Sequence, residues 1–148
     1  VTLEELLSGV VKKYRLWSDA GFAVDIKSCS EKITVRVNVP RTEMILENLL
    51  RNSGEAMSVA GVDPRQGRIE LSCHPEGNFA RLCVRDDGPG VPEDLAKRIF
   101  EPFFTTRESG NGMGLAIGRT LAEAQGGRLW LAPSQSGALF NLTLPISP

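Results

Sequence analysis

Basic residues in this chain are too few and too scattered to form a nucleic-acid surface. The sequence has 17 Lys and Arg against 18 Asp and Glu, for a net charge of −1, whereas a nucleic-acid-binding domain normally carries a basic stripe. The sequence also shows no apolar run of membrane-spanning length and no signal peptide at its start. These absences favour a cytoplasmic domain that binds no nucleic acid.

Cysteine and histidine are equally sparse. Cys29, Cys73 and Cys83 form no CxxC pair, and His74 is the only histidine. This pattern argues against a zinc site or a disulfide framework and predicts reduced, mostly buried thiols. His74 has no acidic neighbour in the sequence and ends an expected strand, so a structural position is favoured over a catalytic one.

The chain fits one domain, residues 1–148. Its first residue is Val rather than Met, so we expect a piece of a longer protein trimmed at its N-terminus. Hydrophobic periodicity predicts helices at residues 3–17, 42–59, 93–99 and 113–124, and strands at 22–28, 33–39, 68–74, 79–85, 128–132 and 138–144. Thr2 and Glu5 are expected to cap the first helix, and Pro40 to end the second strand. This order predicts an α/β (α+β) two-layer sandwich with a mixed, mostly antiparallel sheet and helices on one face.

Two asparagines stand out on the second expected helix. Asn48 and Asn52 are four residues apart, so their amides project from the same helix face. Asn is at best a moderate helix former because its side chain competes for backbone hydrogen bonds, so two Asn residues on one helix face suggest a role other than helix formation. Neutral amide oxygens suit a hard cation such as Mg²⁺ that shares phosphate oxygens. A solvated helix face explains the pair equally well.

A carboxylate and a sharp turn follow the expected strand at residues 79–85. Asp86 comes at the end of that strand, and Gly88-Pro89-Gly90 then bends the chain. A carboxylate in this place can accept a hydrogen bond from an exocyclic amine, which adenine has and guanine lacks at that edge. The same residues are also typical of an ordinary turn.

A glycine-rich segment precedes the helix expected at residues 113–124. Gly110, Gly112 and Gly114 would let the backbone approach phosphates, and the helix N-terminus offers N–H donors and a positive dipole end. The pattern matches neither the dinucleotide-binding fingerprint nor a P-loop. Upstream, residues 102–110 suggest a short mobile flap in which Arg107 reaches a phosphate; an ordinary surface charge is the alternative for Arg107.

In their order, these segments resemble the catalytic ATP-binding domain of two-component sensor histidine kinases. That domain has the Bergerat ATP-binding fold, which it shares with gyrase and mismatch-repair ATPases. Residues 47–56 are similar to the N box, 84–92 to the G1 box, 99–107 to the F box and the lid, and 110–117 to the G2 box. The short lid resembles that of oxygen-, nitrogen- and dicarboxylate-sensing kinases.

The resemblance implies a set of ATP-binding residues. They are Asn48, Asn52, Asp86, Gly88, Gly90, Thr105, Thr106, Arg107, Gly110, Gly112, Met113, Gly114 and Leu115. In this set Asn52 would hold Mg²⁺, Asp86 would hold the adenine amine, and Asn48 and Arg107 would be the catalytic residues. The implied cofactors are therefore ATP and Mg²⁺.

Asn48 separates two chemistries within this resemblance. ATP-hydrolysing relatives carry a Glu there that activates water, and an amide cannot act as a general base. The resemblance therefore implies transfer of the γ-phosphoryl group to a histidine on a helical dimerisation domain, and then to a response-regulator receiver domain. His74 lacks the context of such an acceptor.

The implied parent protein is a homodimer, free or membrane-anchored, while the isolated domain is expected to be monomeric. Two other functions remain open at this point. One is a Bergerat-fold serine kinase such as an anti-sigma factor, and the other is a pseudokinase that docks partners in response to nucleotide.

Overall fold

The computed structural model describes residues 1–18, 21–27, 32–104, 113–134 and 136–148. Within these ranges the helices are α1 (Leu3–Trp17), α2 (Val39–Val59), α3 (Gly114–Ala124) and the short 3-10 helix η1 (Arg98–Phe100). The strands are β1 (Ala23–Ile26), β2 (Arg68–Glu76), β3 (Phe79–Asp86), β4 (Arg128–Ala132) and β5 (Leu139–Pro145).

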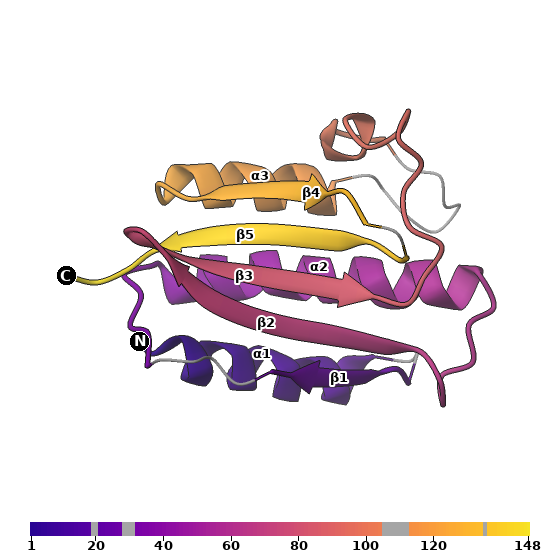
Figure 1. Cartoon of the computed structure of the whole chain (residues 1–148), viewed down its shortest axis with the longest axis horizontal. Helices are drawn as coiled ribbons and strands as arrows, with labels where there is room; N and C mark the ends of the chain where they lie inside the picture. Colours follow the sequence, from indigo (N-terminus) through magenta and orange to yellow (C-terminus); the bar gives the residue numbers. More distant parts are fainter. Residues whose placement is uncertain (19–20, 28–31, 105–112, 135) are drawn as a thin grey trace.

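One sheet contains all five strands, in the order β1-β2-β3-β5-β4. Strand β1 runs parallel to β2, and the three other pairings are antiparallel. Helices α1, α2 and α3 lie together behind the sheet (Figure 1). The predicted two-layer sandwich with a mixed, mostly antiparallel sheet is therefore confirmed.

Helix α1 forms where the sequence pattern predicts it. Thr2 and Glu5 make the expected capping box, and hydrogen bonds from Thr2 hold the pKa of the Glu5 carboxyl below its ordinary value. Leu3, Leu7 and Val10 recur on the inner face of the helix and are buried against the sheet. Burying side chains of this size contributes about 1.5–3 kcal/mol each relative to leaving them exposed.

The strand predicted at residues 33–39 is wrong. Val39 already belongs to α2, with Asn38 as its N-cap and Pro40 in its first turn. Proline is well suited there because its fixed φ is helical and its missing N–H is not needed. The alternation upstream does reflect burial, since Ile33 and Val35 are both in the core, but this segment makes only isolated bridges, one of them from Val35 to Ile146.

The helix predicted at residues 93–99 is replaced by turns over most of its length. Hydrogen bonds such as Leu95 N–H to Pro92 O make successive turns there, and a single 3-10 turn, η1, ends the segment.

Among the described cysteines, Cys83 is a free thiol but Cys73 is in a disulfide bond. The expectation of reduced thiols is therefore wrong for Cys73.

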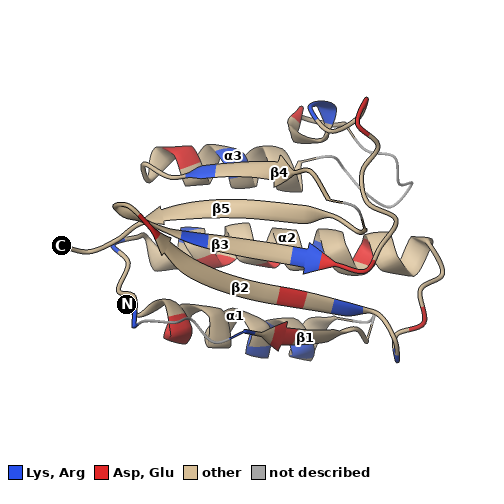
Figure 2. Cartoon of the chain, in the orientation of Figure 1, with Lys and Arg blue, Asp and Glu red and all other residues tan. Residues whose placement is uncertain are grey.

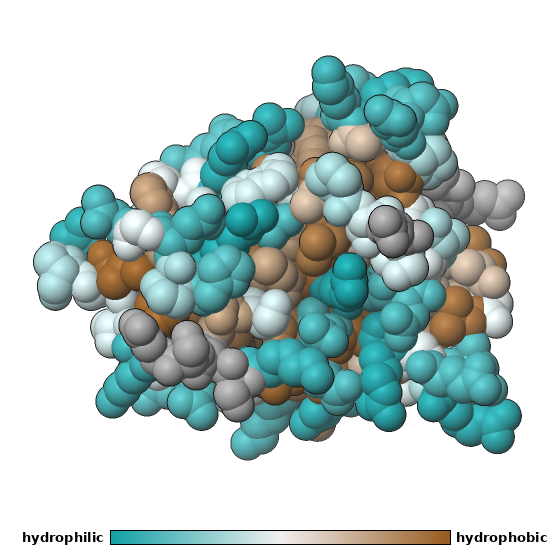
Figure 3. All heavy atoms as spheres, in the orientation of Figure 1, coloured by the Kyte–Doolittle hydropathy of each residue, from teal (hydrophilic) through white to brown (hydrophobic). Residues whose placement is uncertain are grey.

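The surface carries charge of both signs. Lys and Arg are interspersed with Asp and Glu on the helices and strands (Figure 2). The view onto the strands shows mainly hydrophilic side chains around smaller apolar areas (Figure 3). None of the helices in the described ranges is long and apolar enough to cross a membrane.

Candidate functional site

A cavity of about 750 Å³ lies between α2, the loop that follows β3 and the start of α3. A volume of this size is in the range of small-molecule sites. Its polar lining includes Asn48, Asn52 and Asp86. The apolar part of its described lining is formed by Met44, Ala56, Val59, Ala60, Pro89, Val91, Pro92, Leu95, Ile99, Phe104, Leu115, Ile117, Ala138 and Phe140.

Asp86 is held in the cavity wall by the backbone. Asp86 is the last residue of β3 and is only 2% exposed. Oδ1 accepts hydrogen bonds from the N–H of Gly88 at 2.9 Å and from the N–H of Ala138 at 3.1 Å. Oδ2 is also buried and has no partner in the described part of the chain. Leaving a buried acceptor unsatisfied costs about 1–3 kcal/mol, so this oxygen is suited to a donor group on a ligand.

Glycines leave the space that this arrangement needs. A Cβ on Gly137 would lie 1.8 Å from the Asp86 carbonyl oxygen, and one on Gly90 would lie 3.0 Å from the Gly137 oxygen. Both residues have positive φ, +70° and +77°, which glycine adopts without strain. A Cβ on Gly88 would come within 3.0 Å of Asp86 Oδ1. Larger residues at these positions would therefore disturb the carboxylate.

Asn48 and Asn52 lie on the cavity side of α2, as the four-residue spacing predicts. The Asn48 Nδ2 group donates to the Gly114 carbonyl oxygen at 3.2 Å, which ties α2 to the first residue of α3. This bond uses the amide nitrogen of Asn48 and leaves its oxygen as an acceptor. The helix therefore brings two amide groups to one wall, where their oxygens are hard ligands of the type Mg²⁺ prefers.

The N-terminus of α3 forms another part of the cavity wall. Met113, Gly114 and Leu115 all line the cavity, and no side chain in the described ranges caps this helix. The first N–H groups of an α-helix have no partner within the helix, and its dipole is positive at that end. This end of the cavity is accordingly suited to an anion such as phosphate.

Five of the predicted site residues lie outside the described ranges: Thr105, Thr106, Arg107, Gly110 and Gly112. The eight others all lie at one cavity or directly support it. Gly88 is the residue that supports the cavity without lining it, because it packs closely against Asp86 and Met57.

Sequence reasoning missed two parts of the site. Gly137 and Ala138 precede β5, far from Asp86 in the chain, yet they pack against it and bond to it. The only signal was a Ser-Gly-Ala turn before an apolar strand. Arg51 was also missed, although its position between Asn48 and Asn52 places it on the neighbouring face of α2.

Comparisons with known proteins identify the family. Residues 37–148 match the sequence profile described as histidine kinase-, DNA gyrase B- and HSP90-like ATPase. Over 106 residues the chain is 41% identical to the sensor histidine kinase TmoS of Ectopseudomonas mendocina, a match that covers 71% of this chain and 11% of TmoS. The chain thus spans only a small part of that relative.

Solved structures agree with the sequence match. The catalytic domain of histidine kinase ThkA superposes with a TM-score of 0.80 at 28% identity, covering 98% of this chain and 93% of that domain. Full-length ShkA in complex with AMPPNP gives a TM-score of 0.83 at 28% identity, covering 99% of this chain and 30% of ShkA. ThkA in complex with the response regulator protein TrrA gives a TM-score of 0.74 at 26% identity, covering 100% of this chain and 41% of that one.

The profile covers more than half of the chain, and the similar proteins are sensor histidine kinases. The chain therefore belongs to the histidine kinase-, DNA gyrase B- and HSP90-like ATPase family, and within it to the ATP-binding catalytic domains of sensor histidine kinases.

Proposed function

We propose that this domain binds Mg²⁺-ATP in the cavity beside α2 and supplies the γ-phosphoryl group to a histidine on a helical dimerisation domain. The observation that carries the proposal is the buried Oδ2 of Asp86, which lacks a partner in the described ranges. Two backbone N–H groups fix the other oxygen of the same carboxylate, so its orientation is set before any ligand arrives.

Asp86 recognises adenine in this proposal. The exocyclic amine of adenine would donate to Oδ2, whereas guanine presents a carbonyl oxygen there, which would face a carboxylate without a proton between them. We call the region of Asp86, Gly88, Gly90, Gly137 and Ala138 the adenine end of the cavity. Apolar neighbours such as Phe140 and Val91 provide the contact area for a flat ring.

The polyphosphate lies at the other end, where Asn48, Asn52, Met113 and Gly114 meet; we call this the phosphate end. Asn52 is the proposed Mg²⁺ ligand, and the free oxygen of Asn48 lies on the same wall. Bound Mg²⁺ would neutralise phosphate charge. Thr105, Thr106, Arg107, Gly110 and Gly112 are proposed to complete the phosphate contacts, in accordance with the family resemblance.

Asn48 favours transfer over hydrolysis. An amide has no basic lone pair that could take a proton from water at neutral pH, and its nitrogen is already engaged with Gly114. We expect slow ATP hydrolysis and a phosphoryl group that is passed to another nucleophile, with catalysis resting on positioning and charge neutralisation.

The partners follow from the relatives. TmoS is named a sensor histidine kinase, and ThkA has been solved with a response regulator protein. We infer a helical phosphoacceptor domain as the direct substrate and a receiver domain downstream. A cytoplasmic location, a monomeric isolated domain and a dimeric parent protein are parts of the same proposal.

Mixing this domain with a separate helical phosphoacceptor domain and γ-labelled ATP tests the function. Acid-labile phosphohistidine is the expected product. Acid-stable phosphoserine on an offered protein would instead support the serine-kinase alternative. Nucleotide binding without any transfer would contradict kinase activity and favour a nucleotide-dependent docking module.

A further inference from the structure

A second hollow, of about 410 Å³, lies beside the nucleotide cavity, between the end of α1 and the outer face of α2. Arg51 and Glu55 line both spaces. At about 3.6 residues per turn, residues four apart stack along one helix face. These two side chains therefore form the ridge between the cavity and the hollow.

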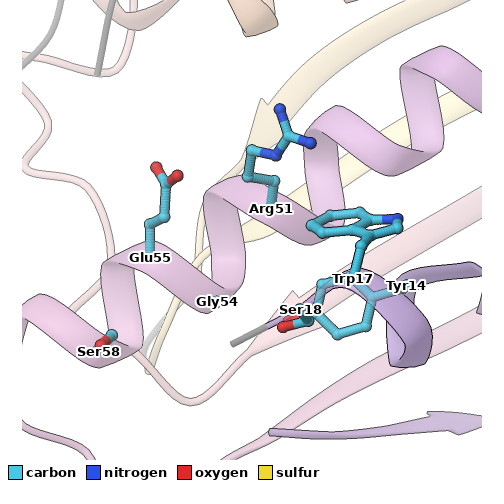
Figure 4. Close-up of a pocket in the computed structure, with 7 residues that line it drawn as sticks. All are labelled: Tyr14, Trp17, Ser18, Arg51, Gly54, Glu55 and Ser58. Atoms are coloured by element: carbon cyan, nitrogen blue, oxygen red, sulfur yellow. The ribbon is translucent and has the colours of Figure 1, made fainter. Parts of the chain in front are cut away.

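Arg51 is held on this ridge by an aromatic pair. Its guanidinium carbon lies 4.7 Å from the centre of the Trp17 ring, and Figure 4 shows the group above the indole. Trp17 meets Tyr14 edge-to-face, with 5.0 Å between ring centroids, and Tyr14 is only 2% exposed. The exposed arginine thus rests on a stack that is anchored in the core.

The stack leaves the hydrogen-bonding groups of Arg51 available. A guanidinium that lies over an aromatic ring is held there by the π electrons of the ring, so the contact does not use up its N–H donors. Within the described ranges Arg51 makes no ion pair with a carboxylate, in contrast to Arg65, which pairs with Asp63. Its charge is therefore not neutralised by a protein group there.

Arg51 is the only cation among the described residues that line the nucleotide cavity; the charged groups with it are Glu55 and Asp86. ATP brings several negative charges into this space, and planar N–H forks bind phosphate oxygens well. Arg51 follows Asn48 by three residues and directly precedes Asn52, so its backbone lies at the phosphate end. Asp86, at the adenine end, is instead bound through Oδ1 by the backbone N–H groups of Gly88 and Ala138.

We propose that Arg51 contacts the polyphosphate of the bound nucleotide, and that Trp17 is a positioning residue that keeps the guanidinium at the phosphate end. This inference rests on the proposed function and extends its phosphate site to a residue outside the glycine-rich segment. The end of α1 thereby becomes part of nucleotide recognition.

Calorimetric titration with ATP and with adenosine tests the contact. Arg51→Gln should weaken ATP binding about fivefold or more, because a charge-assisted hydrogen bond is lost, and should leave adenosine binding unchanged. Arg51→Lys should retain part of the ATP affinity because it keeps the charge. Arg128→Gln is the matched control: Arg128 also stacks on a tryptophan, Trp130, at 4.9 Å, but lines neither space.

Trp17→Leu tests the positioning role. It should reduce ATP affinity by a smaller factor than Arg51→Gln, again without a change for adenosine, since a purely structural defect would weaken both ligands. ATP binding by Arg51→Gln at the wild-type level, or an equal loss for ATP and adenosine, would overturn the Arg51 contact alone. A wild-type domain that binds no ATP would overturn the proposed function and the inference together.

Discussion

The two ends of the nucleotide cavity differ in the contacts that hold their residues in place. At the adenine end, backbone groups of two segments hold the site. The Asp86 N–H donates to the Ala138 carbonyl oxygen at 3.1 Å, and the Ala138 N–H donates to the side-chain Oδ1 of Asp86 at 3.1 Å. At the phosphate end, side chains of α2 face the start of α3, and a 3.2 Å hydrogen bond from Asn48 to the Gly114 carbonyl oxygen links the two helices.

This difference separates recognition from catalysis. In the proposed function, the end fixed by paired strands would select the base through a preorganised acceptor, and a change there should alter stability and affinity together. An end made of half-buried side chains on two helices can be altered with a smaller effect on folding than a buried strand contact. We therefore expect substitutions at the adenine end to lower the free energy of unfolding and the affinity for ATP. Substitutions at the phosphate end should mainly lower the rate of phosphoryl transfer.

The largest expected effect is at Gly137. In Gly137→Ala the new Cβ would lie 1.8 Å from the Asp86 oxygen at a φ of +70°, so the β3–β5 contact must move. We expect a loss of about 3–5 kcal/mol in the free energy of unfolding, measured by urea denaturation. Gly77→Ala is the control, because Gly77 also has positive φ (+62°) but an added Cβ would meet nothing within 4 Å; equal losses in the two variants would contradict the packing argument.

Asn52→Ala examines the phosphate end. Loss of the proposed Mg²⁺ ligand should reduce phosphoryl transfer at least about 100-fold, or roughly 2.7 kcal/mol of transition-state stabilisation. The unfolding midpoint should stay near that of the wild type. Ser58→Ala, on the outer face of the same helix, should transfer normally, and normal transfer by Asn52→Ala would remove this residue from the metal site.

Asp86→Asn tests the adenine end, where we expect a smaller loss, in the affinity for ATP. The substituted side chain can keep one oxygen for the Gly88 and Ala138 N–H groups but would present a donor, not an acceptor, to the adenine amine. We expect ATP binding to weaken by roughly 1–3 kcal/mol in calorimetry. Asp87→Asn is the control, since Asp87 Oδ2 accepts from the Arg68 N–H at 2.8 Å and does not line the cavity; unchanged affinity in Asp86→Asn would refute the adenine assignment.

Local patterns in the sequence predicted most of the fold. The capping box at Thr2 and the spacing of Asn48 and Asn52 depend on residues close in the chain, so periodicity alone locates them. The same reasoning failed at residues 33–39, where alternation correctly marked Ile33 and Val35 as buried but could not show that no continuous partner strand exists. Pro40 was misjudged because proline is compatible with both a strand end and a helix start.

Contacts between distant segments could not be predicted in the same way. The spacing around Asp86 indicated a carboxylate in a turn, yet the N–H that orients it belongs to Ala138, and only the β3–β5 pairing brings the two together. Likewise, nothing local relates Trp17 to Arg51, because the packing of α1 against α2 decides that contact. The sequence therefore predicted which chemical groups line the cavity, and tertiary packing determined which neighbouring groups support them.

The hydrogen bond from Asn48 on α2 to Gly114 on α3 gives the smallest predicted effect on stability. It also tests whether the phosphate end has a role in catalysis that is separate from helix packing. Asn48→Ala removes one part-buried hydrogen bond to Gly114, so the free energy of unfolding should fall by about 0.5–1.5 kcal/mol. Gln125→Ala is its counterpart at the other end of α3, where the Gln125 side chain bonds to Asn38 and Thr42. Thermal unfolding should show a similar loss in both variants, but only Asn48→Ala should also impair phosphoryl transfer. If Gln125→Ala impaired transfer equally, general helix docking would explain the defect, and Asn48 would have no separate role at the phosphate end.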